Sequence, residues 1–315
     1  IPQYRFENHG MSLEAFKGIF WWEWAHRLLG RLIGFVFFVP FLWFAWVGAI
    51  RRSEWPRMIV LFALGGLQGF VGWWMVESGL ETRVSVSQYR LAIHLGVAIV
   101  LLGAILWTGL QYLHPPLEGG SKLAKQVSGR GPPTDFSLRE KNALPARGEG
   151  KLALVLVALV YIQMLLGALV AGLHGGLIYN TWPSMNGRVF PELDFTWTSF
   201  FEDPGLAQFD HRIGAYVVFV AALWLAFRIR SRKPSAQAVN AAGLVAGLAV
   251  FQVVLGIVTL LTQAPVGLAA AHQLSAALLF CACVWQAFEI RRANPQLSSP
   301  AESREAARGE GDPGG

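Results

Sequence analysis

Four histidines in this chain could bind a metal centre in two pairs. Each lies in the first turns of a long apolar segment: His26, His94, His211 and His272. An imidazole near the end of a membrane helix is costly unless it has a partner. Two such rings on facing helices can ligate one metal centre from both sides, which favours haem iron. The pattern predicts one bis-histidine site in each half of the chain.

An internal repeat relates the two histidine pairs. In both halves a His-Arg dipeptide is followed by a glutamine-to-glycine stretch, residues 68–72 or 252–256, and then by the second histidine. The separations are similar, 42 and 26 residues in the first half against 41 and 20 in the second. Corresponding histidines lie at corresponding ends of their segments, so the repeat is parallel. The glutamines favour interhelical hydrogen bonds within it.

Three arginines close to these histidines could contact haem propionates. Arg27 and Arg212 each follow a histidine directly, and Arg90 lies four residues before His94, on the same face of a helix. A guanidinium can hold a carboxylate through two parallel hydrogen bonds. Snorkelling of these arginines to the membrane interface is the alternative.

One acidic residue breaks the symmetry of the repeat. Glu23 lies three residues before His26, and therefore on the same helix face, whereas the second half has Gln208 at the matching position. A carboxylate beside only one metal site would suit proton transfer at a catalytic centre. An acid at a helix start, stabilised by the helix dipole, remains the alternative.

The composition indicates an integral membrane protein. Hydrophobic residues make up 54% of the 315 residues and charged residues only 15%, and the mean hydropathy is +0.42. The net charge of +6 then indicates basic loops on one membrane face, and no nucleic-acid partner is expected. Seven stretches can cross a bilayer at about 20 residues per span. They lie at 22–49, 57–76, 89–112, 152–173, 209–229, 239–261 and 268–290.

The distribution of basic residues predicts the orientation. Lysine and arginine cluster in alternate connections, at 51–57, 122–151, 228–233 and 291–292. The positive-inside rule places these connections and the C-terminus in the cytoplasm or the mitochondrial matrix. The histidines then lie near the periplasmic or intermembrane face of a bacterial or mitochondrial inner membrane.

The repeat also suggests how the chain is organised. We expect an N-terminal half at 1–114, a flexible basic linker at 115–150, a C-terminal half at 151–292 and a disordered tail at 293–315. The second half has a helix, 152–173, before its repeat unit, and the first half has no counterpart. The expected fold is an all-α, pseudo-twofold bundle of four plus four helices, whose first helix would precede Ile1.

Several motifs, in order, resemble the haem A synthases of the alphaproteobacterial and mitochondrial type. They are the stretch from Phe16 to Arg31 with its Glu-Trp-Ala-His-Arg core, residues 68–80, and the Asn-Thr-Trp-Pro-Ser-Met loop at 180–185. The resemblance covers about residues 5–292.

The resemblance implies an oxidoreductase that converts haem O to haem A by oxidising a ring methyl group, through an alcohol, to a formyl group. It implies a haem b cofactor, with its iron on His211 and His272. It places the substrate haem on His26 and His94, beside a catalytic Glu23. Its implied partners are a haem O synthase as supplier, cytochrome oxidase assembly factors, membrane lipid and, as one option, a second copy of the chain.

Two other functions fit the histidine pattern. A di-haem, b-type electron-transfer protein would bind two equivalent haems permanently. A repeat-built transporter with histidines in a proton path would bind no haem. The single glutamate, Glu23, favours the enzyme.

Overall fold

The computed structural model describes residues 9–78, 86–114, 146–190 and 196–293. Within these ranges the chain is predominantly helical and forms no β-strand, apart from an isolated bridge between Met185 and Arg188. Seven of the helices described are long and apolar enough to cross a membrane. The chain is therefore an all-α integral membrane protein, as its composition predicts.

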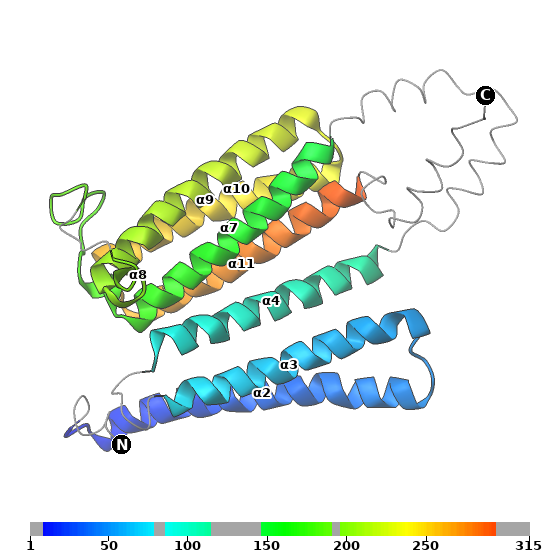
Figure 1. Cartoon of the computed structure of the whole chain (residues 1–315), viewed down its shortest axis with the longest axis horizontal. Coiled ribbons are helices and arrows are strands. Elements are labelled where there is room, and N and C mark those ends of the chain that lie inside the picture. The colour runs from blue at the N-terminus through cyan, green and yellow to red at the C-terminus, as the bar shows by residue number, and fades with distance from the viewer. Residues whose placement is uncertain (1–8, 79–85, 115–145, 191–195, 294–315) are drawn as a thin grey trace, which may run out of the picture. The chain divides into compact units, whose positions relative to one another are not determined.

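The seven long helices correspond one to one with the predicted spans (Figure 1). They are α2 (Leu13–Trp46), α3 (Trp55–Glu77), α4 (Gln88–Leu113), α7 (Ala146–Gly172), α9 (Pro204–Arg232), α10 (Ala236–Leu261) and α11 (Val266–Arg292). The short elements η1 (Arg52–Glu54), η2 (Gly175–Leu177) and α8 (Ser199–Glu202) lie in the connections.

Capping residues explain where the helices exceed the predicted spans. α2 begins at Leu13 rather than at residue 22, because Ser12 accepts a hydrogen bond from the Ala15 amide at 3.2 Å. Ser235 caps α10 in the same way, with the Ala238 amide at 3.0 Å. Hydrophobicity defines the membrane-crossing part of a helix, but polar turns beyond it stay helical when a side chain satisfies their free amides.

Contacts divide the chain into two compact units. The first comprises residues 1–105 and 164–211, and the second comprises residues 106–163 and 212–315. The division into sequence halves stays a prediction. Residues 115–145 of the predicted linker and 294–315 of the predicted tail lie outside the described residues, whereas residues 146–150 of that linker form the start of α7.

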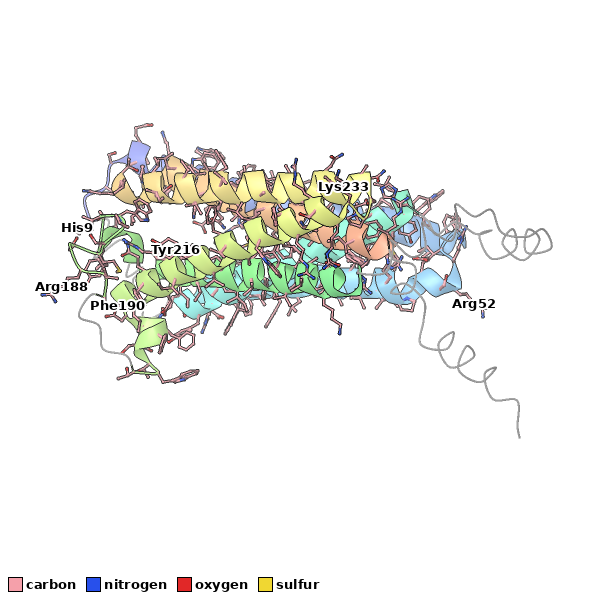
Figure 2. The ribbon with its side chains drawn as sticks, turned by 90° about the horizontal axis from the view of Figure 1, so that it is seen from above. His9, Arg52, Arg188, Phe190, Tyr216 and Lys233 are labelled. Carbon is pink, nitrogen blue, oxygen red and sulfur yellow. The ribbon has the colours of Figure 1, made fainter. Side chains whose placement is uncertain are left out.

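In the first unit, α2 and α3 run side by side and pack through aromatic rings (Figure 1). Phe62 of α3 stacks on Phe37, Phe38 and Phe41 of α2, with ring centroids 5.5–6.3 Å apart. Figure 2 shows Arg52 at one end of this unit and Arg188 at the opposite end.

The end of the first unit that contains Arg188 is organised by short polar contacts. Tyr89 at the start of α4 donates to Glu202 of α8 at 3.1 Å. The neighbouring Gln88 lies so close to Gly172, the last residue of α7, that a Cβ atom there would be 2.7 Å from the Gln88 Cβ. The loop after α7 is thereby held against α4.

In the second unit, α10 and α11 pack through small residues. The buried face of α10 repeats every three or four residues, and most of its members are alanines: Ala238, Ala241, Ala242, Val245 and Ala249. Such faces allow the close backbone approach that stabilises helix pairs in lipid. α11 contributes a buried face that includes Ser275, Ala282 and Cys283.

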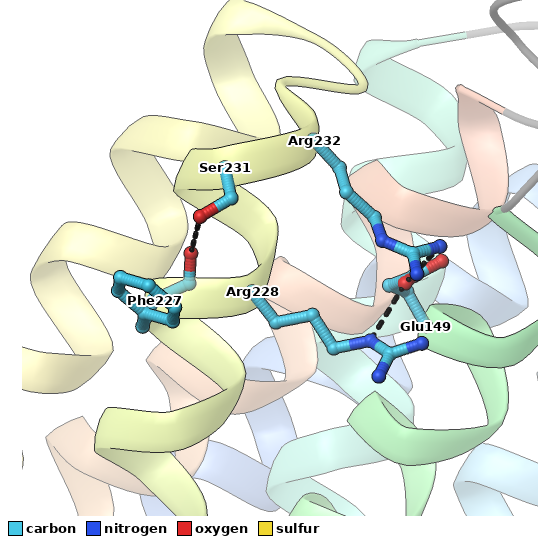
Figure 3. Close-up of polar contacts among 5 residues, drawn as sticks. All are labelled: Glu149, Phe227, Arg228, Ser231 and Arg232. Atoms are coloured by element: carbon cyan, nitrogen blue, oxygen red, sulfur yellow. Dashed lines mark hydrogen bonds and ion pairs between the residues drawn. The ribbon is translucent and has the colours of Figure 1, made fainter.

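A buried ion pair explains why α7 begins earlier than predicted. Glu149 in its first turn is buried, and its carboxylate lies 2.9 Å from both Arg228 and Arg232 of α9 (Figure 3). A carboxylate in the first turn also interacts favourably with the helix dipole. The polar residues before the apolar span are therefore stabilised as helix by contacts with α9.

Candidate functional site

His94 lies against one turn of α3. A Cβ atom at Gly72 would be 2.9 Å from Cε1 of His94, so only glycine leaves room for the ring in this position. One turn earlier, Gln68 places its Nε2 atom 3.2 Å from Nδ1 and 3.3 Å from Nε2 of the same imidazole. Residues four apart share a helix face. The glycine admits the ring edge and the amide hydrogen-bonds to it.

His272 is held by the same combination on α10. A Cβ atom at Gly256 would be 2.8 Å from Cε1 of His272. The Nε2 atom of Gln252 lies 3.3 Å from Nε2 of the imidazole and donates to the His272 carbonyl at 3.0 Å. Ser275, one turn after His272, donates a hydrogen bond to Oε1 of Gln252.

The ring of His211 lies against a glycine of α7 in the same way. A Cβ atom at Gly167 would be 3.1 Å from Cε1 of His211. Gln163 lies four residues before Gly167, as Gln68 lies before Gly72. Three helices therefore carry a glutamine and a glycine four residues apart, with the glycine against a histidine of another helix. We call this glutamine–glycine turn an imidazole seat.

The imidazole seats were only partly predicted from the sequence. The interhelical hydrogen bonds expected for Gln68 and Gln252 are confirmed. Their histidine partners were missed, although the four-residue spacing on three helices, at 68–72, 163–167 and 252–256, was a usable signal.

His26 in α2 belongs to the same compact unit as His94. The pairing of these two histidines on the substrate haem stays a prediction. His211 lies in the first unit and His272 in the second. Their pairing on one haem stays a prediction.

Glu23 lies on the same turn of α2 as His26 and forms an ion pair with Arg27. Both side chains of this pair are about half exposed, at 53% for Glu23 and 50% for Arg27. The matching Gln208 in α9 is buried and donates to the Tyr179 carbonyl at 3.2 Å. The position that differs in sequence between the halves therefore also differs in exposure, because Glu23 is half exposed and Gln208 is buried.

The three arginines predicted to bind propionates have different surroundings. Arg90 donates to the Trp74 carbonyl at 2.7 Å, and its guanidinium lies 4.4 Å from the centre of the Trp74 ring. Arg27 pairs with Glu23, and Arg212 is half-buried in α9. Their contacts with propionates stay predictions.

The residues present suit haem ligation. A histidine that binds iron needs a fixed ring orientation, usually through a hydrogen bond from its second nitrogen to an outer partner. The glycines fix the depth of the His94, His211 and His272 rings, because a side chain at any of the three positions would collide with the imidazole.

Comparison with known proteins identifies the family of this chain. The model of the COX15-CtaA family, described as cytochrome oxidase assembly protein, matches residues 1–284. The chain is 42% identical over 296 residues to the haem A synthase of Parvibaculum lavamentivorans, covering 93% of this chain and 78% of that relative. It is 43% identical over 316 residues to the haem A synthase of Rhodopseudomonas palustris, covering 96% and 80%. For the haem A synthase of Bradyrhizobium diazoefficiens the identity is 46% over 292 residues, covering 91% and 74%.

Proposed function

Because the chain belongs to the COX15-CtaA family of cytochrome oxidase assembly proteins, we propose that it acts as a haem A synthase. The reaction is the oxidation of a methyl group of haem O, through an alcohol, to the formyl group of haem A. The structural observation that supports the proposal is that His26 and His94 lie in one compact unit, with Gly72 against the His94 ring and Glu23 on the same helix turn as His26.

In this proposal the first pair of histidines binds the substrate. His26 and His94 ligate haem O, and Gln68 and Gly72 orient the His94 ring. Glu23 accepts a proton, because the loss of electrons from the methyl carbon to an electron acceptor is accompanied by the release of protons. The ion pair with Arg27 keeps the Glu23 carboxylate oriented along α2 before substrate binds.

The second pair of histidines holds the cofactor. Haem b ligated by His211 and His272 supplies one-electron transfer when bound. The protein contributes the orientation of the two imidazoles through Gly167 and Gly256, whose missing side chains leave room for the rings.

Arginines close to the histidines bind the propionates of the two haems. Arg27 and Arg90 serve the substrate haem, and Arg212 serves haem b. A guanidinium has five N–H donors, so the bond from Arg90 to the Trp74 carbonyl leaves donor capacity for a carboxylate.

In this proposal the protein lies in the inner membrane. Its histidines are near the periplasmic or intermembrane side, and its C-terminus is in the cytoplasm or matrix. Arginines at the ends of α9 and α11, and Arg52 between α2 and α3, support this orientation. A haem O synthase supplies the apolar substrate within the same membrane, and cytochrome oxidase assembly factors receive the product. Membrane lipid surrounds the helices, and a second copy of the chain is one optional partner in this proposal.

Haem analysis of the purified protein tests this function. The chain is produced in membranes that contain haem O, and its haems are extracted and separated by chromatography. We expect haem A, or the hydroxymethyl intermediate, together with haem B. Haem B alone would replace the proposal with the di-haem electron-transfer protein, and the absence of haem would favour the transporter.

A further inference from the structure

A cluster of charged side chains that the proposed haem chemistry does not use lies in the second unit, where α7 begins and α9 ends (Figure 3). Glu149 is buried, and one of its oxygens, Oε1, lies 2.9 Å from Nε of Arg228 and 2.9 Å from Nη1 of Arg232. The two guanidinium nitrogens are therefore no farther apart than twice that distance. One carboxylate thus holds two arginines side by side, and the three side chains together carry a net positive charge.

Arg228 is oriented by contacts on two sides. Its Nε atom donates to Glu149, and that bond does not involve its two terminal nitrogens, which carry most of the N–H donors of a guanidinium. The guanidinium also lies 5.4 Å from the centre of the Trp224 ring, one turn earlier on the same face of α9. The side chain is 33% exposed. An arginine fixed in this way is pre-oriented to bind an oxyanion such as a phosphate through parallel hydrogen bonds.

Exposed aromatic side chains adjoin this arginine along α9. Trp224 is 48% exposed and Phe227 is 73% exposed. α9 is apolar enough to cross a membrane and ends in basic residues, so both aromatic side chains lie deeper in the membrane than the end of the helix. Aromatic rings at this depth meet the interfacial region of a bilayer. A positively charged helix end followed by exposed apolar rings matches the headgroup and the chains of one phospholipid.

The charge around the cluster favours an anionic headgroup over a zwitterionic one. The end of α9 and the residue after it contain four basic side chains: Arg228, Arg230, Arg232 and Lys233. Glu149 compensates one of these charges, and residues 211–288 contain no aspartate or glutamate. A surplus of positive charge attracts a lipid phosphate and disfavours the ammonium group of a zwitterionic lipid.

We propose that Arg228, held by Glu149, binds the phosphate of an anionic phospholipid in the leaflet beside this end of α9. Arg232 and Lys233 add positive charge at the headgroup, and Trp224 and Phe227 lie against the glycerol and the upper part of the acyl chains. The lipid would bind whichever chemistry the histidines perform, because every residue of the site lies apart from them at the other end of α9.

Lipid titration of the full chain tests this site. The protein is purified in detergent and titrated with phosphatidylglycerol or with phosphatidylcholine of the same acyl chains, and bound lipid is measured by native mass spectrometry. We expect the wild-type protein to bind phosphatidylglycerol about tenfold more tightly, because more than one basic residue meets the headgroup. Arg228→Gln should weaken phosphatidylglycerol binding about fivefold, the effect of one basic residue near an anionic surface, and leave phosphatidylcholine binding unchanged.

Two further variants control this measurement. Arg52 is exposed in the basic connection between α2 and α3, so Arg52→Gln removes the same charge away from the cluster and should not change the affinity. Lys233 is exposed and follows the end of α9, so Lys233→Gln removes a charge from the site without touching the Glu149 ion pairs. We expect Lys233→Gln to weaken phosphatidylglycerol binding about fivefold as well.

Equal affinity of the wild-type protein for the two lipids would overturn the proposal. The same conclusion would follow if Arg228→Gln and Lys233→Gln bound phosphatidylglycerol as tightly as Arg52→Gln. If Arg228→Gln does not fold, Lys233→Gln decides by the same criterion. Displacement of bound phosphatidylglycerol by an equal concentration of inorganic phosphate would assign the cluster to a soluble anion and would overturn the lipid site.

Discussion

The turn before His26 in α2 and the turn before His211 in α9 occupy the same place in the repeat, yet their polar side chains have different partners. Glu23 is about half exposed and pairs with Arg27, four residues later on its own helix. Gln208 is buried and donates to the Tyr179 carbonyl in the loop after α7. One side chain is accessible and ionisable, and the other anchors a loop.

This difference shows how a repeat can yield two unlike sites from one backbone. The histidine and the following arginine are present in both turns, so both can serve a haem. At the matching position only the first turn carries a carboxylate that can accept a proton, because Asp210 in the second turn lies on a different helix face from Gln208. In the second turn the same position stabilises the loop near the histidine, which suits a cofactor that stays in place.

The largest effect is expected at Glu23. Glu23→Gln keeps the size of the side chain but removes the proton acceptor, and general acid–base catalysis typically contributes about 10²–10⁴-fold. We expect haem A formation, measured by chromatography of extracted haem, to fall by that factor while haem b content stays constant. A variant that makes as much haem A as the wild-type protein would remove the functional contrast between the two turns.

Substitution of a glycine extends the comparison to His272, the second histidine of the predicted haem b pair. In Gly256→Ala the new Cβ atom would lie 2.8 Å from the His272 ring, which must shift, and haem b affinity should fall by about 10–100-fold. Gly247→Ala on the same helix meets nothing within 4 Å and is the matched control. Haem b absorbance per protein measures both, and equal values would refute the steric role of Gly256.

The ion pairs of Glu149 and of Glu23 sharpen the contrast between a buried and an accessible carboxylate. Glu149→Gln should lower the free energy of unfolding by about 1–2 kcal/mol, less than for a fully buried pair because Arg228 and Arg232 are 33% and 38% exposed. Glu23→Gln should leave stability nearly unchanged, since exposed pairs contribute little. Thermal unfolding in detergent compares the two variants, and similar losses would show that burial does not separate these pairs.

The smallest effect is expected at Gln208. Gln208→Ala removes the hydrogen bond to the Tyr179 carbonyl and should destabilise the loop after α7 by about 1 kcal/mol. Amide hydrogen exchange of residues 176–190 should quicken roughly fivefold, with α10 unchanged as an internal control. Unchanged exchange in the loop would show that Gln208 does not anchor it.

The sequence alone predicted the seven long helices and the repeat that relates the four histidines. Length and hydrophobicity select the spans, and the repeat relates His26 and His94 to His211 and His272 without any tertiary information. Helix limits were less predictable, because caps such as Ser12 and ion pairs such as Glu149 with Arg228 lie outside the apolar segments.

The tertiary structure decided which side chains meet. Spacing alone places Gln252 and Gly256 on one helix face, but it does not say which residue of another helix they face. The packing of α10 against α11 brings that face to His272 and to Ser275. Periodicity along one chain therefore determined the elements and the candidate ligands of this protein. Contacts between helices, which depend on how the faces pack, decided how each ligand is held.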